Sequence, residues 1–247
     1  MTELNPEFIN IDPLKQDYHD SVTHHPDRTL ALQHRNAALL CIDMQYLDAA
    51  PGYGVFAAGQ HSGVPPEAEE YYFNSLHETV FPNVRRLQDE FRSQKLEVIH
   101  VRIQSLTADG RDRSEGHKRL GLHAAPGSKE AEFIEIVAPL ENEIIVNKTA
   151  SGVFNATNLD YILKNMKIEF LYITGVYTNE CVSTSVRDAC DRGFFVTLIE
   201  DACTTVTQEL QDYTITVLKD RYARVMNTAE TIKTIRNYAA LQTLSAN

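Results

Sequence analysis

Three residues of types that act together in catalysis stand at the ends of apolar, strand-like segments. Asp43 and Lys148 close two of these segments, and Cys181 follows a third after a four-residue connection, where it opens a helix-like run. Parallel neighbouring strands bring their carboxyl ends to one edge of a sheet, so the three side chains are expected to converge there. A thiol beside a carboxylate and an ammonium suits nucleophilic catalysis, in which the carboxylate acts as base and the ammonium orients both partners.

The place of Cys181 predicts a reactive thiol. At a helix N-terminus the unpaired N–H groups and the positive end of the helix dipole stabilise a thiolate, so we expect the pKa of Cys181 to lie below the usual thiol value. A lone cysteine in this position would equally suit a buried structural role. Asp43 and Lys148, taken singly, suit a turn cap and a solvated strand end. Their shared position at strand ends favours the catalytic interpretation.

The elements that position these residues alternate regularly along the chain. The six predicted strands cover residues 37–43, 96–102, 143–149, 170–176, 194–202 and 223–228. Helical patterns separate the last four strands, and a helix from Pro82 to about Gln94 precedes the second. Repeated strand–helix pairs with apolar strands predict the α/β fold class, a doubly wound parallel sheet with helices on both faces.

The N-terminal third contains two segments without a regular pattern. Residues 1–36 are polar and are interpreted as an N-terminal extension or arm that wraps its own domain or crosses to another subunit, while residues 37–247 form a single domain. Residues 46–70 are rich in glycine and proline and are expected to form a loop over the first strand. Tyr46 and Tyr53 of this loop are predicted to line the substrate site, and surface packing is the alternative.

A second long loop, dense in charged residues and glycine, follows the second strand. It starts after Arg102 and contains Arg111 and Arg113. A guanidinium group is planar and suits a substrate carbonyl or carboxylate, so these arginines are candidate substrate-binding residues. The alternative is a solvated loop held by internal ion pairs.

Length and composition fit one globular domain, since 247 residues with 43% hydrophobic and 23% charged content can bury a single core. The net charge of −11 and the absence of a long basic cluster argue against nucleic acid as a partner. The sequence has no apolar run of the ~18 residues that a membrane span needs, and its first twenty residues lack the pattern of a secretory signal. These features predict a cytoplasmic protein with four free cysteines and a small-molecule substrate, and with no nucleic-acid or membrane partner.

Residues 38–48, 82–102, 147–163 and 173–205 resemble the isochorismatase-like cysteine hydrolases, which include isochorismatase-type, nicotinamidase-type, ureidoacrylate and biuret amidohydrolases. The resemblance extends over roughly residues 36–235. It implies the strand order 3-2-1-4-5-6 for the six-stranded sheet. A homo-oligomer, a dimer or tetramer, is expected because the N-terminal arm can cross to a neighbouring subunit.

The same resemblance assigns roles to individual residues. It implies that Asp43, Lys148 and Cys181 form an Asp-Lys-Cys triad. It also implies a cis peptide bond between Val176 and Tyr177, and an oxyanion site formed by the N–H groups of Tyr177 and Cys181.

No metal and no cofactor are predicted. Nicotinamidase-like members carry an Asp-x-His arrangement after the second strand, whereas residues 100–104 read HVRIQ and the chain has no tryptophan. The adjacent His24 and His25 do not share a helix face and do not form a local zinc pattern.

The predicted function is hydrolysis of a C–N bond in a small amide or ureide, of the biuret, triuret or ureidoacrylate type, through an acyl-enzyme on Cys181. Gln104, Gln208 and Gln211 are candidate ligands, because a carboxamide offers both a donor and an acceptor to a ureide. The alternatives are hydrolysis of N-carbamoyl acids or simple amides, a catalytically silent binding protein on the same fold, and a redox-sensing thiol protein.

Overall fold

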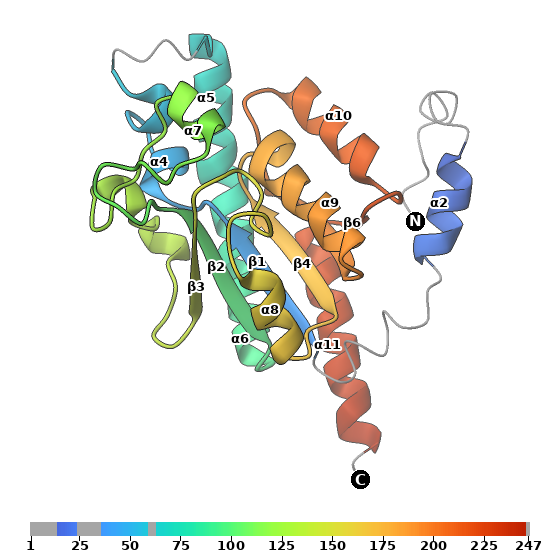
Figure 1. Cartoon of the computed structure of the whole chain (residues 1–247). Coiled ribbons are helices and arrows are strands. Elements are labelled where there is room, and N and C mark those ends of the chain that lie inside the picture. The colour runs from blue at the N-terminus through green and yellow to red at the C-terminus, as the bar shows by residue number, and fades with distance from the viewer. Residues whose placement is uncertain (1–13, 24–35, 59–62, 246–247) are drawn as a thin grey trace.

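The computed structural model describes residues 14–23, 36–58 and 63–245, and its centre is a six-stranded parallel sheet (Figure 1). The strand order is β3-β2-β1-β4-β5-β6, so the predicted fold class and strand order are confirmed. The strands are β1 (Ala37–Ile42), β2 (Glu97–Ile103), β3 (Ile144–Lys148), β4 (Phe170–Gly175), β5 (Phe195–Cys203) and β6 (Arg224–Met226). The ends of each strand lie within two residues of the predicted ends. The central strands could be predicted because continuous apolar runs are characteristic of strands buried on both faces.

Helices cover both faces of the sheet, with α6 and α11 on one side and α8 and α9 on the other (Figure 1). The helices are α2 (Lys15–Thr23), α4 (Tyr46–Ala49), α5 (Pro66–Ser75), α6 (Phe81–Ser93), α7 (Glu115–Arg119), α8 (Leu159–Asn165), α9 (Ser183–Asp191), α10 (Gln208–Leu218) and α11 (Thr228–Ser245). Two π-helical turns, η2 (Leu76–Val80) and η5 (Thr178–Val182), lead into α6 and α9, and the 3-10 turns are η1 (Gly54–Phe56), η3 (Lys129–Ala131) and η4 (Glu135–Val137).

Side chains of each central strand divide between two apolar cores. In β1, Leu39 and Cys41 pack on the side of α6, while Leu40 and Ile42 pack on the side of α9. This alternation follows from the two-residue period of a strand. β1 pairs with β2 and with β4, so it occupies the centre of the sheet and every one of its residues is buried.

Residues 46–70, predicted as a loop, contain more regular structure than the sequence indicates. Helix α5 begins at Pro66, and its Tyr72 and Phe73 are buried in the core beside α6. Proline is common in loops, but in the first helical turn it loses no hydrogen bond, so Pro66 can start a helix. The prediction of an irregular segment is therefore wrong at α4, at η1 and from Pro66 onward.

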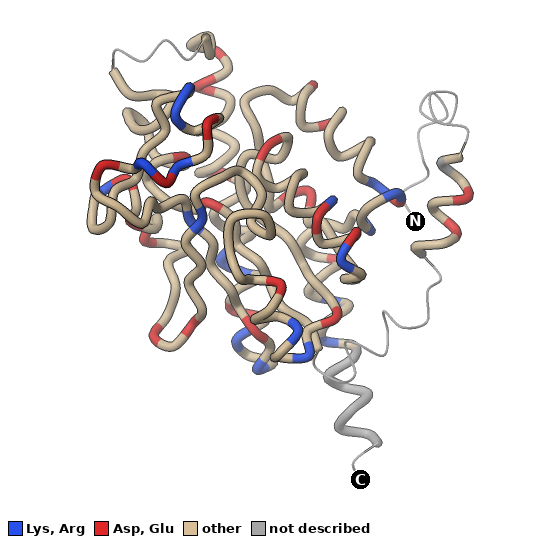
Figure 2. The backbone as a smooth tube through the Cα atoms, viewed as in Figure 1, with Lys and Arg blue, Asp and Glu red and all other residues tan. Residues whose placement is uncertain are grey.

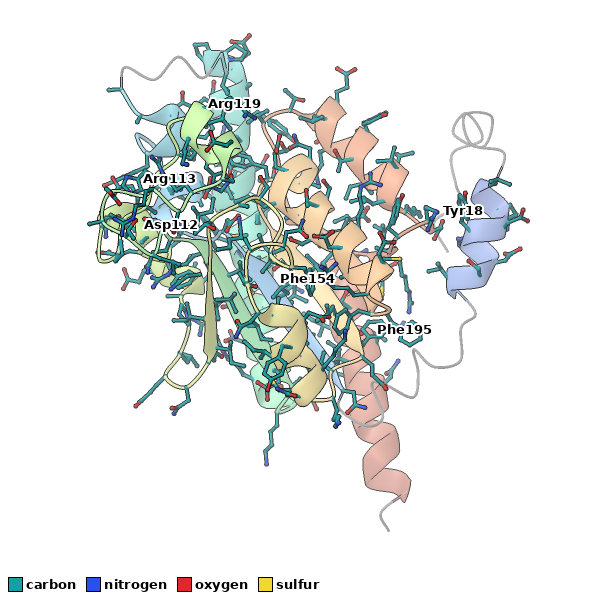
Figure 3. All side chains as sticks on the ribbon, viewed as in Figure 1. Tyr18, Asp112, Arg113, Arg119, Phe154 and Phe195 are labelled. Atoms are coloured by element: carbon teal, nitrogen blue, oxygen red, sulfur yellow. The ribbon has the colours of Figure 1, made fainter. Side chains whose placement is uncertain are left out.

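Part of the predicted N-terminal arm also forms a helix, α2. The ring of Tyr18 lies 5.4 Å from the guanidinium of Arg221, and His19 lies 3.1 Å from Asp220, so α2 contacts the segment between α10 and β6. Figure 3 labels Tyr18 on this helix. Residues 1–13 and 24–35 of the predicted arm lie outside the described residues. Within the described part of the chain, no helix is long and apolar enough to cross a membrane.

Candidate active site

Asp43, Lys148 and Cys181 come from three different strand ends. Asp43 directly follows β1 and turns the chain sharply with a φ of 55°, a conformation that aspartate tolerates better than most residues. Lys148 is the last residue of β3, and Cys181 lies in η5, the π-helical turn after β4. The parallel order of these strands therefore brings the three residues to the carboxyl edge of the sheet.

The ammonium group of Lys148 joins the other two side chains. Its Nζ lies 2.9 Å from Oδ2 of Asp43 and 3.3 Å from Sγ of Cys181, and it also donates to the carbonyl of Ala150 at 3.0 Å. Asp43 and Lys148 are fully buried, and Cys181 is 6% exposed. We call these three residues the Asp-Lys-Cys cluster. Its geometry places a carboxylate and a thiol within reach of one buried cation.

The electrostatics of the cluster differ from the prediction for Cys181. Burial raises the pKa of the Cys181 thiol well above its usual value, and the neighbouring Asp43 carboxylate raises it further, although Lys148 acts in the opposite direction. The predicted lowering of this pKa is wrong, because the helix N-terminus holding Cys181 is buried beside a carboxylate. The resting form is a neutral thiol.

The pKa shifts of the partners complement this state. Burial also raises the pKa of Asp43, against the opposing effect of Lys148 and of a hydrogen bond with Cys181. Burial alone would lower the pKa of Lys148, but the Asp43 carboxylate raises it above the usual lysine value. Lys148 is therefore a permanent cation at neutral pH, and Asp43 is a carboxylate with an increased affinity for a proton.

The segment between β4 and η5 has the backbone that the resemblance implies. The peptide bond between Val176 and Tyr177 is cis, and the amide of Val176 donates to the carbonyl of Ile42 at 3.0 Å. Gly175, with a φ of 124°, lies so close to Ile42 that a Cβ atom there would overlap the Ile42 carbonyl oxygen. Only glycine allows β4 to approach the end of β1 in this way.

Two buried polar side chains near the cluster were missed by the sequence analysis. Asp48 of α4 is 3% exposed, and both Asp43 and Lys148 influence its pKa. His117 of α7 is also 3% exposed, and burial, Lys148 and Arg113 together lower its pKa to about 4. The position of Asp48 five residues after Asp43 is a signal that could have found it, whereas the sequence around His117 contains none.

Tyr46 and Tyr53, predicted to line the substrate site, contact each other edge to face with ring centroids 5.4 Å apart. The ammonium of Lys129 lies 3.8 Å from the centroid of the Tyr46 ring. Their role in substrate binding stays a prediction.

The predicted arginine ligands take part in contacts with the surrounding loops. Arg102 donates to Asn147 and to the Ala131 carbonyl, both at 2.8 Å. Arg111 pairs with Asp109 at 3.2 Å, in a loop along which acidic and basic residues alternate (Figure 2).

Arg113 lies in the same loop, next to Asp112 (Figure 3). Its guanidinium donates to the carbonyls of Gly110 and Leu122 at 2.9 and 2.7 Å. These contacts match the alternative of a loop held by internal interactions, and substrate binding by its arginines stays a prediction.

The three candidate glutamines occupy different environments. The main-chain N–H of Gln104 donates to the main-chain carbonyl of Lys148 at 3.1 Å, which places this residue beside the end of β3. Gln208 is exposed and contacts Tyr71 and Asp212, while Gln211 is buried and donates to main-chain carbonyls at 3.3 Å. Substrate binding by each remains a prediction.

No group of three His, Cys, Asp or Glu residues within residues 14–23, 36–58 and 63–245 has an arrangement that could hold a metal ion. The effect of a chelator on turnover tests the prediction of a metal-free site.

A parallel α/β sheet with a thiol, a carboxylate and an ammonium at its carboxyl edge is the arrangement expected of a cysteine hydrolase. The isochorismatase domain model matches residues 37–230 of the chain. This match covers most of the sequence, and the chain belongs to the isochorismatase family.

Individual relatives agree with this assignment. The chain is 29% identical over 190 residues to the ureidoacrylate amidohydrolase of Variovorax paradoxus, covering 70% of each protein. It is 29% identical over 125 residues to the N-carbamoylsarcosine amidase of an Arthrobacter species, covering 47% of this chain and about half, 46%, of the relative. A cysteine hydrolase structure from Pseudomonas syringae has a TM-score of 0.69 at 22% identity, covering 83% of this chain and 94% of that one, and shows the same fold.

Proposed function

We propose that the protein hydrolyses a C–N bond of a small amide or ureide through a covalent intermediate on Cys181. The observation that carries the proposal is the position of the Lys148 ammonium, 2.9 Å from the Asp43 carboxylate and 3.3 Å from the Cys181 sulfur. The relatives named as ureidoacrylate amidohydrolase and N-carbamoylsarcosine amidase support the same bond type.

The first half of the proposed reaction forms the acyl-enzyme. Asp43 takes the proton of the Cys181 thiol while the sulfur attacks the substrate carbonyl carbon, and the carbonyl electrons move to oxygen. The N–H groups of Tyr177 and Cys181 are proposed to stabilise that oxyanion, as the resemblance implies. The intermediate collapses, the C–N bond breaks, and Asp43 returns its proton to the leaving nitrogen.

The second half restores the enzyme. Asp43 takes a proton from a water molecule that attacks the thioester-type carbonyl, the C–S bond breaks, and the proton returns to sulfur. Lys148 stabilises the anionic sulfur and holds it beside the carboxylate. Because the resting thiol is neutral and its pKa is raised, formation of the nucleophile depends on proton transfer to Asp43 as the sulfur attacks.

The test measures ammonia release from biuret, triuret, ureidoacrylate, N-carbamoyl amino acids and nicotinamide, with and without a chelator. We expect turnover of at least one ureide, loss of that turnover in Cys181→Ala, and no effect of the chelator. Cys190→Ala is the matched control, because Cys190 lies in α9 outside the Asp-Lys-Cys cluster. Equal rates in wild type and Cys181→Ala would overturn the mechanism, and inactivity on every compound would favour the silent binding protein.

We also propose that the chain acts in the cytoplasm as a dimer or tetramer, with residues 1–36 as an extension of the hydrolase domain. Light scattering on the full chain tests the oligomeric state, and fractionation of cells that express it tests the location. A monomer in solution would contradict the proposed dimer or tetramer.

A further inference from the structure

The ion pair between Asp43 and Lys148 joins two strands that are not neighbours. Strand β2 lies between β1 and β3, whereas the three residues of the Asp-Lys-Cys cluster come from the ends of β1, β3 and β4 (Figure 1). Neighbouring strands lie about 4.8 Å apart, so the backbones of β1 and β3 are roughly 10 Å from each other. The 2.9 Å contact between the two side chains therefore depends on how the chain after β1 is fixed over the end of β2.

Main-chain pairing between β1 and β2 ends at Asp43. The N–H group of Asp43 donates to the Val101 carbonyl at 2.9 Å, and the φ of 55° then turns the chain. Strand β2 continues to Ile103, which pairs in register with Lys148 of β3. Residues two apart on a strand direct their N–H and C=O groups to the same neighbouring strand, so Ile103, like Val101, faces the side of β1. The register between β1 and β2 ends at Val101, two residues before Ile103.

The side chain of Gln45 takes the place of the missing β1 peptide. Its Nε2 donates to the Ile103 carbonyl at 2.9 Å, and its Oε1 accepts from the Ile103 N–H group. A carboxamide offers the donor and the acceptor of a peptide group, so Gln45 continues the ladder between β1 and β2 with its side chain. The second N–H of the carboxamide donates to the Glu130 carbonyl at 2.8 Å. Gln45 is fully buried, which shields these bonds from water.

The main chain around Gln45 is fixed on its other side. Gln45 forms an antiparallel bridge with Phe133, and the residues before and after it bond to residues 132–134 at 2.9 Å. Residues 44–46 are thus held between β2 and the segment after η3. Apart from the ion pair with Lys148, neither carboxylate oxygen of Asp43 has a hydrogen-bond partner among the described residues. The position of the Asp43 carboxylate therefore depends on the backbone that Gln45 fixes.

We propose that Gln45 is a positioning residue for the reaction, because its carboxamide ties the turn after Asp43 to Ile103 and so holds the Asp43 carboxylate at the Lys148 ammonium. This proposal rests on the proposed function, since it concerns the general base of the same site. The side-chain hydrogen bonds of Gln45 go to main-chain groups, so Gln45 acts through Asp43 and transfers no proton itself.

The first experiment compares Gln45→Met with wild type on a ureide that wild type turns over. Methionine keeps the approximate length and volume of the side chain and removes the carboxamide. We expect kcat to fall by about tenfold or more and KM to change by less than about threefold. A displaced base slows proton transfer, whereas the contacts of the bound substrate stay in place.

Gln88→Met is the matched control. Gln88 is also fully buried and donates to a main-chain carbonyl, that of Val137 at 2.9 Å, but it lies in α6. This variant loses a buried carboxamide in the same way and should keep kcat within about twofold of wild type. The comparison separates a positioning role of Gln45 from a general loss of stability.

A second readout needs no substrate. The pH dependence of Cys181 alkylation by iodoacetamide, followed by mass spectrometry, gives the apparent pKa of the thiol. Burial and the Asp43 carboxylate raise this pKa, and Lys148 opposes them. Displacement of the carboxylate in Gln45→Met should therefore lower the apparent pKa by about 0.5 or more, and Gln88→Met should leave it unchanged.

Gln45→Asn is a second variant, in case Gln45→Met does not fold. It keeps the carboxamide but shortens its reach by one methylene group, so it should show both changes to a smaller extent. A lowered thiol pKa in these variants of a protein that turns over no ureide would support the role of Gln45 and contradict the proposed function alone. A kcat within about twofold of wild type, an unmoved thiol pKa, or an equal loss of kcat in Gln88→Met would overturn the positioning role.

Discussion

Two clusters of charged side chains, one partly buried and one fully buried, lie at opposite ends of strand β3, and they satisfy their hydrogen bonds to different degrees. Glu143 at the amino end accepts two bonds from Arg92 at 2.8 and 2.9 Å, one from the Leu140 amide at 2.8 Å, and contacts His100 at 2.9 Å. We call Arg92, His100 and Glu143 the Glu143 cluster.

The Asp-Lys-Cys cluster at the carboxyl end is less complete. Asp43 forms an ion pair with Lys148, but neither of its carboxylate oxygens has a further hydrogen-bond partner among the described residues, and the nearby Asp48 also has an oxygen without one. A carboxylate with all its acceptor positions filled stabilises a fold, whereas one with free positions can receive a proton or a ligand. The comparison separates a structural cluster from a reactive one in the same sheet.

The largest effect is expected from Lys148→Met, which removes the cation of the Asp-Lys-Cys cluster. Turnover should fall by at least about 10²-fold, since the stabilisation of the anionic sulfur is lost. The free energy of unfolding should fall by about 3–5 kcal/mol, because removal of one partner leaves a buried group unpaired. Urea unfolding and initial rates measure both, with Lys164→Met in the exposed pair with Asp160 as control. Undiminished turnover would remove Lys148 from the mechanism.

A smaller effect confined to stability is expected from Glu143→Gln. The hydrogen bonds of Arg92 and Leu140 outweigh burial and hold the pKa of Glu143 at about 2. The unfolded carboxyl titrates near its usual value, so Glu143 contributes stability above about pH 4.5 that is lost as the pH falls towards 2.

The variant should therefore be about 1–3 kcal/mol less stable than wild type at pH 7, with a smaller difference at pH 3. Turnover at pH 7 should change by less than about twofold, because the Glu143 cluster lies at the other end of β3. Urea unfolding at both pH values measures the difference, and a large loss of turnover would contradict the division between the clusters.

An effect limited to acidic pH is expected from His117→Asn. Burial and the nearby charges lower the pKa of His117 to about 4, so this side chain is neutral at pH 7. Between about pH 6.5 and 4 the unfolded state binds a proton that the folded state does not, and wild-type stability falls over that range. The variant should lose less stability between pH 7 and 4. A His117 pKa near 6.5 by NMR would contradict the expected burial.

The smallest effect is expected from Asp89→Asn, which breaks an exposed ion pair on α6. Asp89 lies 2.9 Å from Arg85, with both side chains half-exposed, and 3.6 Å from Arg92. Exposed pairs contribute little, so the free energy of unfolding should change by less than about 1 kcal/mol. A change as large as that of Glu143→Gln would show that burial does not explain the difference between charge clusters.

The central strands and Asp43 were predictable for the same reason. A strand buried on both faces is a continuous apolar run, and the first polar residue after it marks the sheet edge. Asp43 could be located in this way, whereas Lys148 is the last residue of the edge strand β3, in which buried and exposed positions alternate and the polar Asn147 comes first. Their distance from Cys181 could not be predicted, because it depends on strand order, which local patterns do not encode and which came from the family resemblance.

Features that depend on tertiary contacts could not be read from the chain. Gln211 occupies a polar helix position, yet it is buried against main-chain carbonyls of β5. Cys181 stands at a helix start that would be solvated in isolation, and its burial reverses the expected pKa shift. The glycine and proline content around Asp48 predicts a loop, whereas the tyrosine hydroxyls that fix its backbone come from α5 and from the segment before η5. Each case is decided by which element packs against the residue.

Gly175 has a consequence for the recognition of related sequences. It permits the contact between β4 and Ile42, one residue before Asp43, and any side chain there would push the two strand ends apart. A sequence with Asp, Lys and Cys at matching positions but a larger residue here would retain the three chemical groups and lose the distances between them. In a search of genomes or a library of designed variants, this glycine would separate chains that can assemble the site from chains that only have Asp, Lys and Cys at matching positions.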